Sequence, residues 1–211
     1  MKTIHGDELH LAVAAVEAGD LVVLPTRRWY MICAAATNAD ACDRIFQGKR
    51  RPKTKSLAFV IPHTEAAADL FALTPQAKAL ASAFWPGDLA LMLPRADPAR
   101  GQRHAVVGTP HALVTQAPGV LGELATRARV PIAATTVNIS GTQTEPGPAI
   151  IPSEVTQFVD QTGVDPAYLV DGGICPIANH LTIVDCTARD ARIVRSGVIH
   201  DRAVNAAIDG V

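Results

Sequence analysis

Short apolar runs separated by polar, turn-forming segments recur along this chain, and their lengths are typical of β-strands. Strands are predicted at residues 21–24, 30–35, 57–61, 89–93, 105–107, 132–135, 168–170, 181–186 and 192–194. Helix start and stop signals predict helices at 7–18 and 38–48, from 64, from 74, at 120–129 and at 153–160. Short strands interleaved with helices indicate an α/β fold in which helices cover a sheet. Some strands follow one another too closely for a helical crossover, so the sheet should be mixed.

Single residues set the ends of several predicted elements. Asp7 can cap the first helix, and Asn38 can cap the second, because short polar side chains accept hydrogen bonds from free backbone N–H groups. Thr74 followed by Pro75 is a favourable helix start. Residues 142–151 are rich in turn formers and predict a surface loop, which is either a plain connection or a lid.

Length and composition indicate one folded domain over residues 1–211, because 48% of the residues are hydrophobic and only 18% are charged. Acidic residues interrupt the apolar stretch at the N-terminus, and no apolar run reaches the ~18 residues that a membrane-spanning helix needs. We therefore expect neither a signal peptide nor a membrane anchor. Four cysteines without paired or zinc-ligand spacing fit reduced, buried thiols and a cytoplasmic location.

Charge narrows the choice of partner. The net charge of −1 excludes a polycation that coats nucleic acid, so RNA binding should be weak and any anion site should be local. The chain has no GxxxxGK[ST] phosphate loop, no GxGxxG, no HExxH and no GxSxG. Its seven histidines lack metal-ligand spacing, so no protein-bound metal is predicted.

Three segments carry candidate chemistry. Residues 49–55, KRRPKTK, place five cations at the expected end of a helix. They fit either a solvated basic helix terminus or a clamp for a polyphosphate, in which arginine offers a bidentate fork. Residues 135–141, TTVNISG, follow a strand and offer hydroxyl and amide groups, although they also read as an ordinary turn. Arg195 leaves a late strand and by itself indicates little.

Taken in order, these segments resemble the YrdC-like family, whose best-known members are threonylcarbamoyl-AMP synthases. Residues 24–30, LPTRRWY, are similar to the family's PTxTVYGL, and 49–57, KRRPKTKSL, to KxRPxxxPL. Residues 84–91, FWPGDLAL, are close to FWPGPLTL, and 131–141, PIAATTVNISG, match PIAAPSANxSG. The DGG at 171–173, the TIVD at 182–185 and the RSG at 195–197 continue the family order, so the resemblance covers roughly residues 10–200.

The resemblance implies an open, strongly twisted mixed sheet with a concave, basic cavity. It also implies a reaction in which an amine and bicarbonate form a carbamate that attacks the α-phosphate of ATP. Pyrophosphate leaves and a carbamoyl-AMP mixed anhydride remains. Such an enzyme mainly orients its reactants and neutralises phosphate charge, which agrees with the lack of a nucleophile–base pair in this sequence. Mg²⁺ is the expected companion of ATP.

Carried over by position, the nucleotide half of the site is intact. The basic residues Lys49 and Arg51 fall on family positions that hold the ATP phosphates and are the expected catalytic groups. The other positions matched to nucleotide binding are Thr136, Asn138, Ser140 and Arg195.

The pocket for the second substrate departs from the family pattern. Its expected positions are Thr26, Arg28, Tyr30, Met31, Gly108 and Leu181. Arg28 replaces a threonine, Met31 a glycine and Leu181 a serine. Gly108 stands where the arginine that pairs with the substrate carboxylate is expected. Either the pocket takes a different partner, or Arg27 or Arg28 supplies the missing cation.

The predicted function is therefore ATP-dependent adenylation of a carbamate, with an altered amine or amino acid and, through the family, a link to tRNA modification. One alternative is formation of carbamoyl-AMP from carbamoyl phosphate, which would need a separate downstream carbamoyl-transfer enzyme. The other is a non-catalytic protein that binds nucleotide or RNA.

Overall fold

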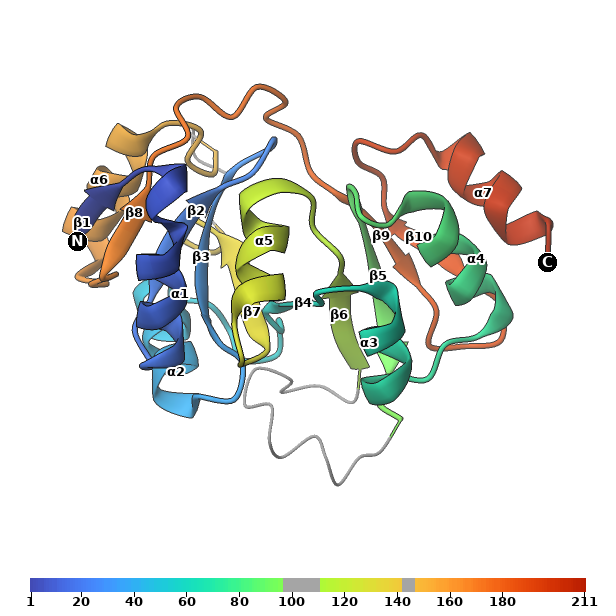
Figure 1. Ribbon diagram of the computed structural model, residues 1–211. Helices are drawn as coiled ribbons and strands as arrows, with labels where there is room; N and C mark the ends of the chain where they lie inside the picture. The colour runs from blue at the N-terminus through green and yellow to red at the C-terminus, as the bar shows by residue number, and fades with distance from the viewer. Residues whose placement is uncertain (97–110, 142–146) are drawn as a thin grey trace.

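The computed structural model describes residues 1–96, 111–141 and 147–211 of the chain (Figure 1). These residues form one mixed sheet of ten strands in the order β1-β8-β2-β3-β7-β4-β6-β5-β9-β10. The strands are β1 Lys2–Ile4, β2 Val22–Pro25, β3 Tyr30–Ala35, β4 Ala58–Val60, β5 Leu89–Pro94, β6 His111–Thr115, β7 Ile132–Thr136, β8 Tyr168–Val170, β9 Thr182–Asp185 and β10 Arg192–Arg195. Parallel and antiparallel pairs both occur, which confirms the predicted α/β fold with an open mixed sheet.

Seven α-helices and one 3-10 turn flank the described sheet on both faces. The helices are α1 Leu9–Glu17, α2 Ala39–Gly48, α3 Thr64–Leu70, α4 Pro75–Phe84, α5 Gly119–Arg127, α6 Pro152–Thr162 and α7 Asp201–Asp209, and the turn is Gly6–Glu8. Figure 1 shows α1 and α5 side by side over one face, whereas α4 and α7 lie together at the C-terminal end. No helix among the described residues is long and apolar enough to cross a membrane.

Strand alternation explains why the core has two layers. Val23, Tyr30 and Ile32 belong to one buried cluster, which includes side chains of α2, α4, α6 and α7. Val22, Leu24 and Met31 belong to the other cluster, with side chains of α1 and α5. Successive side chains of a strand point to opposite faces, so continuous apolar strands need cover on both sides.

Polar caps fix several helix ends as predicted. The Asn38 side chain accepts a hydrogen bond from the Ala41 backbone N–H at 2.9 Å, and Thr74 does the same for Ala77 at 3.1 Å. Asp7 is not a cap, contrary to the prediction, because it lies inside the 3-10 turn and α1 begins only at Leu9. The four cysteines are buried and unpaired, as expected, and burial raises the pKa values of Cys42 and Cys186 to about 12.

Three elements were not predicted: β1, β6 and α7. The strand expected at 105–107 and part of the loop expected at 142–151 lie outside the described residues.

The register of the central strands places the candidate site. Ala134 of β7 pairs with Ala58 of β4, and Ala58 pairs with Leu113 of β6. These small and apolar side chains therefore form one row across the sheet, on the face that also carries Met31.

Candidate functional site

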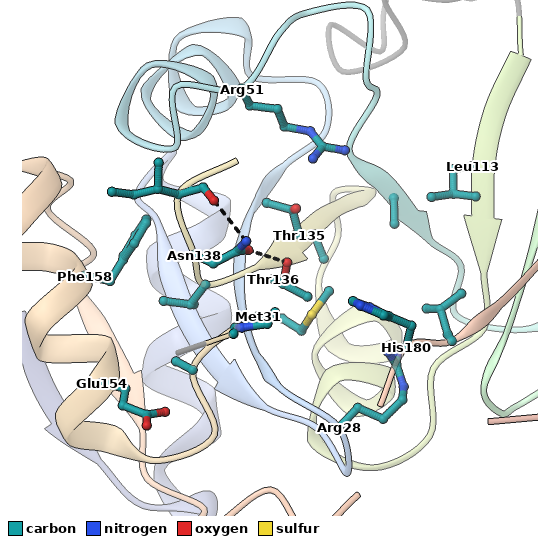
Figure 2. Close-up of a pocket in the computed structure, with 18 of the residues that line it drawn as sticks. Arg28, Met31, Arg51, Leu113, Thr135, Thr136, Asn138, Glu154, Phe158 and His180 are labelled. Carbon is teal, nitrogen blue, oxygen red and sulfur yellow. Dashed lines mark hydrogen bonds between the residues drawn. The ribbon is translucent and has the colours of Figure 1, made fainter. Parts of the chain in front are cut away.

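A cavity of about 620 Å³ opens above this row of side chains. Met31, Ala58, Leu113 and Ala134, from four neighbouring strands, form its floor. Polar residues surround the floor, and they are Arg28, Arg51, Ser56, Thr135, Thr136, Asn138, Glu154, Gln157, Gln161, His180 and Arg195. Figure 2 shows Arg51 and Arg28 at opposite ends, with Thr136 and Asn138 between them. The cavity thus combines an apolar floor with two separate cationic ends.

Arg51 is fixed by the backbone that follows α2. Its Nε donates to the Lys55 carbonyl at 2.8 Å, and its Nη2 donates to the Ser56 carbonyl at 2.7 Å. Two bonds from one guanidinium hold the planar group in one orientation at the cavity wall. Burial lowers the pKa of Arg51, although an arginine stays charged at neutral pH. Arg51 therefore offers a preoriented positive charge.

The loop after β7 is organised by Lys49. The Lys49 side chain is 1% exposed, and its Nζ donates to the carbonyls of Thr136 and Asn138 and to Asn138 Oδ1. The Thr136 hydroxyl also donates to Asn138 Oδ1, at 2.7 Å. Asn138 Nδ2 completes the arrangement with a bond to the Ile139 carbonyl at 3.1 Å. One buried ammonium therefore gathers the oxygens of the loop from behind.

The environment of Lys49 shifts its proton equilibrium. Burial, and secondarily the nearby charge of Arg51, lower the Lys49 pKa to about 7. A buried charge is costly, and among the described residues no carboxylate pairs with this amine, so it is poised between its two protonation states near neutral pH. An anion bound beside Arg51 would favour the charged form.

The other end of the cavity gathers Arg28, His180 and Arg195. Arg195 Nε donates to the Leu181 carbonyl at 3.1 Å, and the His180 ring contacts Trp29, with 5.9 Å between ring centroids. Burial, then Arg195, then Arg28 lower the pKa of His180. Burial, then Arg28, lower the pKa of Arg195. Arg28 and Arg195 are close enough for their positive charges to repel each other, which favours a bound anion between them.

Asp88 holds Arg28 in place. Arg28 is 8% exposed, and its Nε donates to Asp88 Oδ1 at 2.8 Å. The second oxygen of Asp88 pairs with Arg27, whose side chain is 59% exposed. Arg28 also lines a smaller cavity of about 20 Å³, and Asp88, Thr26, Thr115, Val60, Leu121 and Leu181 are among its walls. Arg28 thus stands between the two cavities.

Most residues expected at the site lie at one cavity. Those that line it are Arg28, Met31, Arg51, Thr136, Asn138, Leu181 and Arg195. Lys49 does not line it, contrary to the prediction that it faces the cavity, because its Nζ is turned toward loop carbonyls. Ser140 also does not line it, and its backbone N–H donates to the Lys49 carbonyl at 2.8 Å.

The remaining expected positions lie elsewhere. Thr26 lines only the smaller cavity. Tyr30 lines neither cavity, since its hydroxyl is buried against the loop after β8, where it donates to the Gly173 carbonyl at 2.9 Å. Gly108 lies outside the described residues.

Sequence reasoning missed His180, Glu154 and Asp88. His180 lies in a loop after Asn179, where no sequence motif distinguishes it. Its contact with Trp29 is visible only in the structure. Glu154 reads as a first-turn acid of α6, where its Oε2 accepts the Ile150 N–H at 2.7 Å. Asp88 sits inside the FWPGDLAL segment, and its sequence neighbours gave no hint of two arginine partners.

Among the described residues, no group of three or more His, Cys, Asp or Glu side chains is placed to hold a metal ion. The expected Mg²⁺ stays a prediction.

Comparisons with known proteins show which family this chain is similar to. The family model Sua5_yciO_yrdC, described as "Telomere recombination", matches residues 14–197. The threonylcarbamoyl-AMP synthase of Bacillus subtilis is 30% identical over 199 residues, which are 93% of this chain and 55% of that protein. The putative threonylcarbamoyl-AMP synthase of Mycobacterium tuberculosis is 30% identical over 192 residues, which are 89% of this chain and 83% of that protein.

Solved structures show the same fold. A crystal structure of P. abyssi Sua5 complexed with L-threonine superposes with a TM-score of 0.82 at 27% identity, covering 98% of this chain and 59% of that chain. E. coli YciO superposes with a TM-score of 0.78 at 18% identity, covering 94% of this chain and 95% of that one. The chain spans about half the length of the Bacillus and Pyrococcus relatives.

Proposed function

Because the chain belongs to the Sua5_yciO_yrdC family, we propose that it adenylates a carbamate with ATP, in the manner of a threonylcarbamoyl-AMP synthase but with a different amine. The amine condenses with bicarbonate to give a carbamate and water. One carbamate oxygen attacks the α-phosphorus of ATP, the bond from the α-phosphorus to the bridging oxygen breaks, and pyrophosphate leaves. The product is a carbamoyl-AMP mixed anhydride. The attacking oxygen belongs to the substrate, so the protein supplies position and charge.

The observation that carries the proposal is that Arg51 and the loop held by Lys49 lie next to each other at the same cavity. Arg51 is fixed by two carbonyls at one end of the cavity. Beside it, Thr136 and Asn138 line the wall and are held by the buried Lys49 ammonium. A preorganised cation next to ordered amide and hydroxyl groups suits a nucleotide polyphosphate and needs little rearrangement on binding.

Within this proposal Lys49 positions the loop rather than standing in the open cavity. Charge on a triphosphate beside Arg51 would raise the pKa of Lys49 from its lowered value of about 7. Nucleotide binding near pH 8 should therefore take up a fraction of a proton. Calorimetry in buffers of different ionisation enthalpy measures this uptake, and release of protons instead would contradict the assignment.

The second substrate belongs at the Arg28 end of the cavity. Arg28 and Arg195 supply positive charge there, away from Arg51, whereas the lowered pKa of His180 keeps its ring mainly neutral at neutral pH. The carbamate formed on the amine must bring an oxygen to the α-phosphorus, so the two ligands would meet over the floor of the cavity. Carbamoyl phosphate is the competing second substrate, since its phosphate would suit the same cations.

The test is pyrophosphate release. The protein is mixed with ATP, Mg²⁺, bicarbonate and a panel of amines and amino acids, with carbamoyl phosphate in a separate arm. Release that requires both bicarbonate and an amine supports the proposed reaction. Release with carbamoyl phosphate alone would replace it with the carbamoyl-transfer reaction. Nucleotide binding without release in any arm would identify a binding protein instead.

A further inference from the structure

The small cavity beside Arg28 has a largely apolar lining, and its charged members, Arg27, Arg28 and Asp88, are paired with one another. Among the described residues around it, Met31, Val60, Leu121 and Leu181 contribute aliphatic or thioether side chains. Its volume of about 20 Å³ accommodates one group the size of a methyl or a water. A group that enters it from the main cavity therefore exchanges water for hydrocarbon contacts.

The two hydroxyls of this lining are already used. Thr26 Oγ1 donates to the Trp29 carbonyl at 2.8 Å, and Thr115 Oγ1 donates to the Leu89 carbonyl at 2.8 Å. Neither hydroxyl proton is available to a ligand unless an internal bond breaks. Since a buried polar group without a partner loses its hydration, a ligand hydroxyl placed here would be disfavoured relative to a methyl.

Arg28 stands at the junction of the two cavities with part of its guanidinium free. Its Nε is bonded to Asp88. Within residues 1–96, 111–141 and 147–211, no side chain or carbonyl accepts a bond from its terminal Nη atoms. One carboxylate oxygen of Asp88 pairs with Arg27 and the other with Arg28. The group formed by these three residues therefore has a net charge of one positive unit. A free guanidinium edge and an excess positive charge suit a carboxylate.

We propose that the amine substrate is an α-amino acid with a short aliphatic side chain, whose carboxylate binds Arg28 and whose side chain enters the small cavity. The inference rests on the proposed function, because it names the amine that becomes the carbamate. Asp88 is the positioning residue, since it fixes the guanidinium that meets the carboxylate. An apolar pocket of this kind prefers a methyl over an isosteric hydroxyl by up to about 10²-fold.

The experiment uses the isosteric pair L-valine and L-threonine, together with L-valinamide, which lacks the carboxylate. Binding of each is measured by NMR titration of the full chain loaded with a non-hydrolysable ATP analogue. We expect L-valine to bind several-fold or more tightly than L-threonine, and at least tenfold more tightly than L-valinamide. Threonine binding as tightly as valine, or valinamide equal to valine, would overturn the inference.

Two variants assign the effect to Arg28. Arg28→Met should abolish the difference between valine and valinamide. Arg192→Met is the matched control, because Arg192 also pairs with a buried aspartate, Asp185, but is mostly exposed and lines neither cavity, so it should keep that difference. If Arg28→Met does not fold, Arg28→Lys keeps a charge and loses the fork, and it should shrink the difference. A difference that survives in the folded Arg28 variant contradicts the assignment.

Pyrophosphate release separates the two proposals. Release with threonine and not with valine would leave the adenylation reaction standing and remove the aliphatic preference. The expected binding pattern without release for any amino acid would leave the carboxylate site standing and remove the adenylation reaction.

Discussion

Replacement of Lys49 by methionine tests whether one buried amine holds the nucleotide-binding loop. Lys49 is 1% exposed, and its Nζ serves the carbonyls of Thr136 and Asn138 together with Asn138 Oδ1. Methionine has a similar length and no donor, so it fills the space and removes all three bonds. The Asn138 amide oxygen keeps a partner, because the Thr136 hydroxyl still donates to it.

The size of the effect follows from the two carbonyls that lose this donor. Each buried acceptor left unsatisfied costs about 1–3 kcal/mol, so the pair costs about 2–6 kcal/mol. Removal of the amine also removes the free-energy cost of burying its charge, and that burial is the main cause of its lowered pKa. We therefore expect the free energy of unfolding to fall by about 2–4 kcal/mol, in the lower half of that range.

Chemical denaturation of both proteins at several pH values measures this difference. The folded-state pKa of Lys49 is about 7, below the ordinary 10.5 that it regains on unfolding. The unfolded state then binds more protons between these values, so the wild type gains stability as pH rises, by up to about 1.4 kcal/mol per pH unit. Below pH 7 the contribution is constant. The gap between wild type and Lys49→Met should thus widen from pH 7 to pH 9.

Two results would refute this reasoning. A Lys49→Met protein as stable as the wild type would mean that the loop carbonyls do not depend on the amine. A stability gap that narrows as pH rises would mean that Lys49 has a raised pKa instead of a lowered one. Lys53→Met is the control, because Lys53 is exposed and pairs only with Asp43 among the described residues, so its removal should leave the Lys49 bonds in place.

Three further outcomes are expected. Arg51→Ala should weaken ATP binding by about 1.5–3 kcal/mol in calorimetry, because a charge-assisted hydrogen bond is lost. Unchanged affinity would mean that Arg51 does not bind the nucleotide. The same titration between low and high salt should show the wild type losing affinity and Arg51→Ala losing less, because the site is open to ions. Asp88→Asn should lower the free energy of unfolding by about 3–5 kcal/mol, because Arg28 loses its buried partner. Asp43→Asn, at the exposed pair with Lys53, should change it by less than about 1 kcal/mol.

The sequence predicted best those elements whose side chains are buried on both faces. The predicted bounds of Tyr30–Ala35 and Tyr168–Val170 match those of the strands. Lys2–Ile4 escaped notice because it is a short edge strand with one buried residue and no apolar run. The helix Asp201–Asp209 was not predicted, because most of its residues are polar or small and only two side chains, Val204 and Ile208, pack against the core.

The site was predictable only as far as local motifs reach. Arg51, Thr136 and Asn138 lie in segments with the spacing of a known family, and they line one cavity. The inward direction of Lys49 was not predictable, since a lysine within a run of cations reads as solvated. The bond between Arg28 and Asp88 joins residues 60 positions apart, and nothing in either segment reveals it.

Transfer of bicarbonate carbon into an AMP adduct is the decisive test of whether this protein adenylates a carbamate. The protein is incubated with ATP, Mg²⁺, L-valine or L-threonine, and ¹³C-bicarbonate, and the nucleotide products are analysed at once by mass spectrometry. We expect an AMP adduct that carries the amino acid and gains one mass unit from the labelled carbon. We also expect the adduct to be lost in Arg51→Ala. An AMP adduct that lacks the label would contradict the proposed reaction, and so would the absence of any adduct with either amino acid.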